Sequence, residues 1–114
     1  MRVIEQKIGL DELKKLAEER FGDMVKAVVD VARGIMVVGG ELHSDQEALL
    51  LDRGSRQADL WGINIYPDEP PTSWIEFDSM INVRPSQGNR SRGIENQSTQ
   101  AAIRRVTATL VTDT

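Results

Sequence analysis

Two valine-rich segments that follow one another in the chain constrain the fold more than any other feature. Residues 25–31 and 35–38 are almost entirely apolar, and Ala32, Arg33 and Gly34 between them fit a tight turn. Because β-branched side chains favour strands, the two segments predict a β-hairpin. Neither strand alternates cleanly between apolar and polar residues, which predicts that both are covered on two faces. We therefore expect this hairpin at the centre of a sheet.

Two segments near the ends of the chain have the features of helices that pack on such a sheet. Apolar residues recur at helical spacing in residues 10–21, and Gly22 can end that helix in the left-handed conformation. Residues 96–111 carry a second apolar stripe at the same spacing, with Asn96 or Ser98 as the N-cap. Both segments predict helices with one buried face.

A shorter helix is predicted over residues 45–53. Ser44 and Glu47 have the spacing of a capping box, which satisfies free N–H groups at a helix start. A strand through residues 48–51 is the alternative for this segment. A short first strand is expected over residues 3–6.

The remaining regular segments predict a second hairpin. Residues 60–66 alternate and predict a strand, and residues 67–73 form a rigid loop with three prolines. Residues 74–83 predict a longer strand, bulged near Ser79, which Pro85 ends because proline cannot donate a backbone hydrogen bond. The expected fold is α+β, a small, mainly antiparallel sheet with two or three helices in the order β-α-β-β-α-β-β-α.

Length and composition narrow the class of protein. A chain of 114 residues predicts one domain, residues 1–114. No apolar stretch reaches the ~18–20 residues that cross a bilayer, and no signal-peptide core follows the start, so we expect no membrane partner. With no cysteine, the expected location is the reducing cytoplasm. The single histidine excludes a multi-histidine metal site, and we expect neither a metal nor another cofactor.

The charge is unevenly distributed along the chain. The formal net charge is −4, and residues 1–83 hold 9 Lys and Arg against 16 Asp and Glu. Residues 84–114 hold five arginines against two acidic residues. This balance excludes the broad basic field of a bulk DNA-binding protein. It leaves a local concentration of arginine, whose rigid fork of donors suits carboxylate and phosphate groups.

A polar surface is predicted on the second hairpin. Side chains alternate along strands, so pairing of residues 60–66 with residues 74–84 would gather one polar set on one face. The set consists of Asn64, Tyr66, Glu76, Asp78, Asn82 and Arg84. The alternative is an ordinary solvated sheet face, which needs no function.

The loop that follows, residues 84–93, is the strongest candidate for ligand binding, and we call it the arginine loop. Its candidate binding residues are Arg84, Ser86, Gln87, Asn89, Arg90 and Arg92. All can donate hydrogen bonds to an anion, which favours a phosphate, nucleotide or carboxylate clamp. We expect the three arginines to converge on one anion-accepting spot beside Asn82 and Glu76. The alternative is that Glu76 and Asp78 hold the arginines themselves.

Proton transfer has three candidate residues, His43, Glu76 and Asp78. A lone histidine can act as a general base near neutral pH. His43, Asp45 and Glu47 also have a spacing that could bind Mg²⁺ or Mn²⁺. Helix capping explains the two acidic residues better, so no metal site is predicted.

Two motifs give the chain a family resemblance. Residues 61–67 read WGINIYP, and residues 81–92 read INVRPSQGNRSR. Together with residues 25–31, VKAVVDV, residues 39–43, GGELH, and residues 47–51, EALLL, they make the chain similar to a family of small prokaryotic proteins catalogued as a domain of unknown function. The resemblance implies a cytosolic bacterial or archaeal protein, and it carries over no reaction, ligand or catalytic residue.

Two functions follow from the residues. The first is a binder of, or an enzyme acting on, a phosphate-bearing small molecule or RNA end, in which Asn64, Asn82, Gln87 and Asn89 recognise neutral groups. The second is a non-catalytic homo-oligomer or partner-binding protein, with a homodimer as the simplest case and the arginine loop as its interface. A ligand site requires a concave pocket that receives these side chains.

Overall fold

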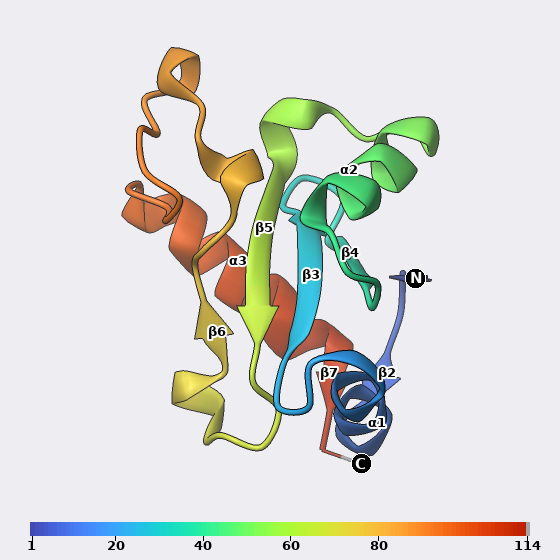
Figure 1. Ribbon diagram of the computed structural model, residues 1–114. Coiled ribbons are helices and arrows are strands. Elements are labelled where there is room, and N and C mark those ends of the chain that lie inside the picture. The colour runs from blue at the N-terminus through green and yellow to red at the C-terminus, as the bar shows by residue number, and fades with distance from the viewer. Residues whose placement is uncertain (114) are drawn as a thin grey trace.

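The two valine-rich segments form the centre of the sheet, as the sequence predicts (Figure 1). The computed structural model describes residues 1–113. Strands β3 (Val25–Asp30) and β4 (Ile35–Val38) pair antiparallel, with Val28 opposite Val37. The sheet has five strands in the order β1-β4-β3-β5-β6, so both valine-rich strands have a neighbour on each side. The other strands are β1 (Arg2–Ile4) and β6 (Ile75–Glu76) at the two edges and β5 (Leu60–Ile65) between β3 and β6.

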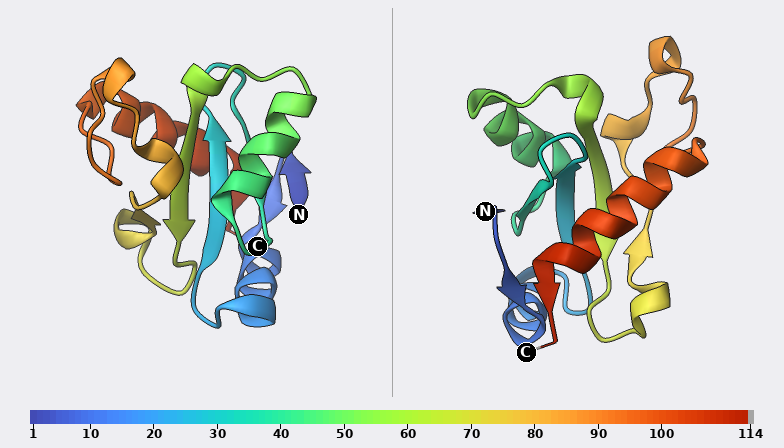
Figure 2. Two further views of the ribbon diagram at one scale, coloured as in Figure 1. Left: turned by 45° about the horizontal axis from the view of Figure 1, so that its top comes forward. Right: turned by 180° about the vertical axis from the view of Figure 1, so that it is seen from behind.

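Three helices cover the two faces of this sheet, which confirms the α+β class (Figure 2). Helix α2 (His43–Asp52) packs its Leu50 with Val28 on one face. Helices α1 (Leu10–Arg20) and α3 (Gln97–Leu110) bury their apolar stripes in the core on the opposite face. Alternate residues of β3 therefore serve two cores, and this explains why its sequence does not alternate.

Two short parallel strands join the ends of the chain, and the sequence analysis did not predict them. Strand β2 (Ile8–Gly9) pairs with β7 (Val111–Thr112), with Ile8 opposite Val111. The pair holds the segment before α1 against the end of α3.

The helix ends follow the predictions in two cases and depart from them in one. Asn96 caps α3, because its side-chain oxygen accepts a hydrogen bond from the Thr99 N–H at 3.0 Å. Gly22, with a φ of 93°, follows the end of α1. The helix predicted over residues 45–53 is present, so the alternative of a strand through residues 48–51 is wrong. The predicted capping box of Ser44 and Glu47 is also wrong. Helix α2 begins at His43 after Leu42, with no side-chain cap.

The long strand predicted over residues 74–83 is also wrong. Strand β6 pairs with β5 only over Ile75–Glu76, and the chain then forms 3₁₀ turns at Met80–Asn82 (η3) and Pro85–Gln87 (η4). A side chain takes the place of the missing strand. The Gly62 N–H of β5 donates to Asn82 Oδ1 at 2.8 Å, and Asn82 Nδ2 donates to the Gly62 carbonyl at 2.9 Å. The Asn82 carboxamide thus forms the hydrogen bonds at Gly62 that a neighbouring strand would otherwise form.

Candidate anion-binding cleft and the arginine loop

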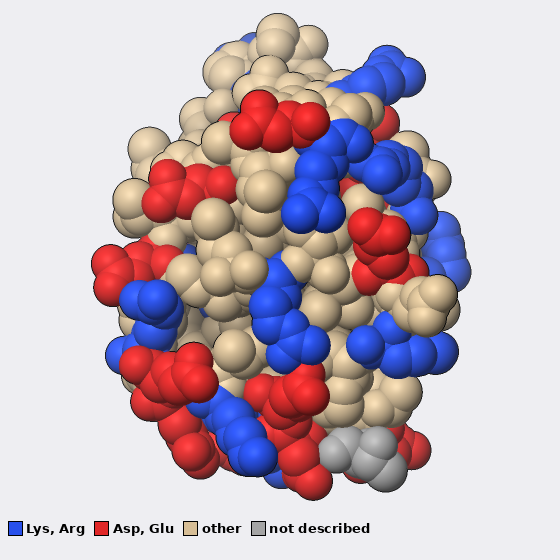
Figure 3. Space-filling model, turned by 90° about the vertical axis from the view of Figure 1, so that its right-hand side faces the viewer, with Lys and Arg blue, Asp and Glu red and all other residues tan. Residues whose placement is uncertain are grey.

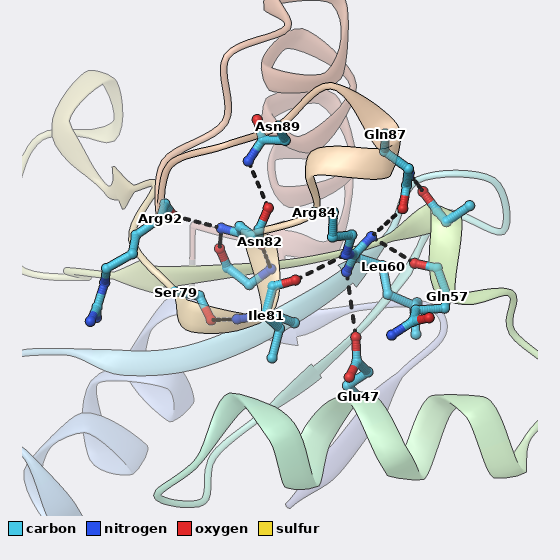
Figure 4. A network of polar contacts seen from close by, with 12 residues as sticks. Glu47, Gln57, Leu60, Ser79, Ile81, Asn82, Arg84, Gln87, Asn89 and Arg92 are labelled. Carbon is cyan, nitrogen blue, oxygen red and sulfur yellow. Dashed lines mark hydrogen bonds and ion pairs between the residues drawn. The ribbon is translucent and has the colours of Figure 1, made fainter.

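Arg84 holds the arginine loop to the body of the protein. Its side chain is 8 % exposed, and its donors reach three backbone carbonyls: Ile81 at 2.9 Å, Gln57 at 2.8 Å and Leu60 (Figure 4). It also forms an ion pair with Glu47 at 3.4 Å. Burial lowers the pKa of Arg84, and the Glu47 carboxylate opposes that shift. Since these contacts occupy its donors, Arg84 is not placed to bind an external anion.

Asn82 of η3 and Asn89 of the arginine loop are bonded to backbone in the same way. Asn82 contacts both polar groups of Gly62, and its Nδ2 also donates to the Arg92 carbonyl at 3.0 Å. Asn89 Nδ2 donates to the carbonyls of Asn82 at 2.7 Å and Gly93 at 2.8 Å. Both asparagines are buried, at 0 % and 3 % exposure. These amides fix the loop conformation and have little capacity left to recognise a ligand.

The outer part of the loop is more accessible. The Glu95 carboxylate accepts from the Arg90 N–H at 2.6 Å and the Ser91 N–H at 3.1 Å, and these bonds lower the pKa of Glu95. The side chains of Ser86 and Arg90 are exposed. Gln87 Nε2 donates to the Ala58 carbonyl at 3.2 Å.

The predicted polar face exists over its first half. Asn64 and Tyr66 both donate to Glu76 Oε1, at 2.8 Å and 3.2 Å. Partial burial and the neighbouring Glu76 raise the pKa of Tyr66. Beyond β6, Asp78 accepts from Arg92 Nε at 2.6 Å.

The three arginines of the loop do not converge on one spot, and this corrects the sequence-based expectation. Arg84 projects toward Glu47 of α2, whereas Arg92 projects away from it and pairs with Asp78 (Figure 4). Arg90 is exposed on the loop. The expectation depended on a strand through residue 83, and the chain leaves the sheet after Glu76 instead. Arg92 interacts with two of the candidate proton-transfer residues, Asp78 and His43.

A cleft of about 170 Å³ lies between the start of α2 and η3, next to β5. Its polar lining is contributed by five residues from four parts of the chain: Lys26, His43, Ser44, Ser79 and Arg92. Gly62 lets these parts approach closely. A Cβ at Gly62 would lie 2.6 Å from the Ser79 side chain and 3.2 Å from His43 Cγ.

His43 is the buried member of this cleft. It is 6 % exposed, and its Nε2 lies 2.8 Å from the Ile63 carbonyl oxygen. A carbonyl can only accept, so Nε2 carries the proton and Nδ1 carries a lone pair. Nδ1 has no hydrogen-bond partner among residues 1–113. Burial is the main cause that lowers the pKa of His43; Lys26 and Arg92 lower it further, while the bond to Ile63 and the Asp78 carboxylate oppose the shift.

Sequence reasoning identified His43 and Arg92 but missed the other polar residues of the cleft. Lys26 gave a signal, because it is a charged residue inside an otherwise apolar strand. Ser44 was assigned to a helix cap, and Ser79 to a bulge. In the part of the chain that the structure describes, no group of three or more acidic or histidine side chains could hold a metal ion.

The surface charge and the helices give two further observations. Both signs of charge are present on the face that Figure 3 shows. None of the helices in residues 1–113 is long and apolar enough to span a membrane.

Comparison with known proteins gives one match. No curated protein and no solved structure matches the chain. A family model described as a protein of unknown function, DUF5674, matches residues 2–110. This range includes the five strands of the large sheet and the three α-helices. It also includes the arginine loop and all the residues of the cleft. The chain therefore belongs to the DUF5674 family.

Proposed function

We propose that the protein binds a phosphate-bearing small molecule in the cleft between α2 and η3. One observation carries the proposal: two cationic side chains, Lys26 and Arg92, line the same small cavity as the buried, neutral His43. Net charge over the rest of the chain is negative, so this pairing of cations around a cavity is a local feature. An anion in the cavity would offset the charge of Lys26 and would add a second anionic partner to Arg92, which already pairs with Asp78.

The chemistry of the lining suits a phosphate group. Arg92 uses its Nε for Asp78, and its terminal amino groups have no partner within residues 1–113. Ser44 and Ser79 add hydroxyl groups, and Ser44 lies in the first turn of α2, where backbone N–H groups lack partners within the helix. A phosphate offers acceptor oxygens to all of these donors.

His43 gives the cleft a group that can accept a proton. Its Nδ1 lone pair is available at neutral pH because its pKa is lowered. In a bound ligand, a hydroxyl or a protonated phosphate oxygen near Nδ1 would donate to it. We assign His43 this role in the binding of the ligand, and as general base if the ligand reacts.

A second candidate function is partner binding, which one observation favours. A groove of about 350 Å³ lies between β6 and α3, lined largely by apolar surface of residues that include Trp74, Ile75 and Ala108. The exposed Arg90 would add an ionic contact to a second copy, as the sequence analysis expects. Light scattering decides this candidate, because a homodimer has twice the mass of the 12.7 kDa chain, and Arg90→Ala should weaken a dimer that uses the loop. We also propose that the protein is located in the cytoplasm.

The test of the proposed function is stabilisation by inorganic phosphate. A ligand that binds only the native state raises stability by mass action, about 2.7 kcal/mol at a hundred times its Kd. We expect phosphate to raise the melting temperature of the wild type. Lys26→Met and Arg92→Gln should each weaken phosphate binding about three- to tenfold, since each removes one charge from the cavity.

Arg90→Ala is the matched control for this experiment. Arg90 lies two residues from Arg92 in the same loop and is exposed outside the cleft. Its removal should leave the phosphate response unchanged. If Arg92→Gln responds like the wild type, or Arg90→Ala loses the response, the anion does not bind in this cleft.

A further inference from the structure

Two exposed apolar side chains stand beside the cationic lining of the cleft. Leu42, the residue before α2, is 55 % exposed, and Met80, the first residue of η3, is 65 % exposed. Both line the cleft together with Lys26 and Arg92. Single exposed apolar residues are common on protein surfaces. Here two of them, from different elements, adjoin one cavity, so the site combines charge with accessible apolar surface.

The size of the cleft limits how a ligand can fill it. Its volume is about 170 Å³, below the roughly 300–1,000 Å³ of sites that enclose a drug-sized ligand. A phosphate group fits inside, but a whole nucleotide does not. The organic part of a phosphate ester must therefore extend out of the cleft, past its exposed lining residues Leu42 and Met80.

We propose that the ligand is a phosphate ester with a planar aromatic group, and that Leu42 and Met80 hold this group; the inference rests on the proposed function. A flat ring can contact both side chains at once and remove their apolar surface from water. The Met80 thioether also makes favourable contacts with aromatic rings. A polar organic group placed there would lose water without gaining hydrogen-bond partners.

Two esters of the same charge type test the inference by titration calorimetry. Phenyl phosphate presents a planar ring, and glycerol 3-phosphate presents two hydroxyl groups. We expect the wild type to bind phenyl phosphate about tenfold more tightly. The Leu42→Ala/Met80→Ala double variant should bind the two esters with nearly equal affinity and should keep the affinity of the wild type for inorganic phosphate.

Leu51→Ala is the control variant, because Leu51 is an exposed apolar residue of α2 that does not line the cleft. It should keep the preference for phenyl phosphate. Equal binding of both esters by the wild type, or a preference that survives in the double variant, would overturn the inference while leaving the phosphate site intact. If inorganic phosphate does not bind either, the proposed function fails as well.

Discussion

Replacing Arg84 by alanine should destabilise the protein by about 3–5 kcal/mol, whether or not phosphate is present. The substitution leaves the Glu47 carboxylate, with 14 % of its side chain exposed, without its counter-ion. It also removes the donors that reach the carbonyls of Ile81, Gln57 and Leu60. The stacking of the guanidinium on Trp61, 4.7 Å from the ring centroid, is lost too. Urea denaturation followed by circular dichroism measures the change.

Arg90→Ala provides the comparison, since it removes an exposed arginine of the same loop. Exposed substitutions of this kind usually change stability by no more than about 0.5 kcal/mol. If the free energy of unfolding of Arg84→Ala stays within about 1 kcal/mol of the wild-type value, Arg84 does not hold the loop to the body of the protein. If its stability differs from that of the wild type only when phosphate is present, Arg84 is a ligand-binding residue, as the sequence alone predicts.

Replacing Asn82 by alanine should cost about 2–4 kcal/mol. Asn82 is fully buried, and its loss leaves the Gly62 N–H and the carbonyls of Gly62 and Arg92 without this partner. A buried polar group without a hydrogen bond costs about 1–3 kcal/mol. The specific measurement is the hydrogen-exchange rate of the Gly62 amide. In the variant this rate should increase by more than the loss of global stability alone would produce.

Gln87→Ala is the control for Asn82, because it removes an exposed amide side chain from the same region. It should change stability by less than about 1 kcal/mol and leave exchange at Gly62 unchanged. Slow exchange of the Gly62 amide in Asn82→Ala would show that this side chain does not complete the sheet edge.

The centre of the fold could be predicted from the sequence because its signals are local. The hairpin of β3 and β4 follows from an apolar run, a tight turn and a second apolar run, and the cap of α3 follows from Asn96. The second hairpin could not be predicted beyond Glu76. An alternating pattern continues to residue 83, but the edge of β5 is completed by the Asn82 side chain, 20 residues from Gly62 in the chain. Spacing within one segment does not reveal such a contact.

The candidate site was harder to predict for the same reason. Arg84 resembles a ligand-binding arginine in sequence, and its burial depends on Glu47, 37 residues earlier. Glu47 in turn resembles a capping residue, and its partner lies outside its helix. The cleft brings Lys26 of β3 together with His43 of α2 and Arg92 of the loop. Only the packing of α2 and η3 over Gly62 shows that these residues meet.

The most direct test of the anion site is the pKa of His43, measured by nuclear magnetic resonance. The chain has one histidine, so the imidazole resonances report His43 alone. Burial lowers this pKa in the free protein. An anion beside Lys26 and Arg92 stabilises the imidazolium, so saturating sulfate, which does not titrate between about pH 5 and 8, should raise the pKa. Sulfate should accordingly bind more tightly as the pH falls through that pKa, and a pKa unchanged by concentrations of sulfate that stabilise the protein would contradict an anion site in the cleft.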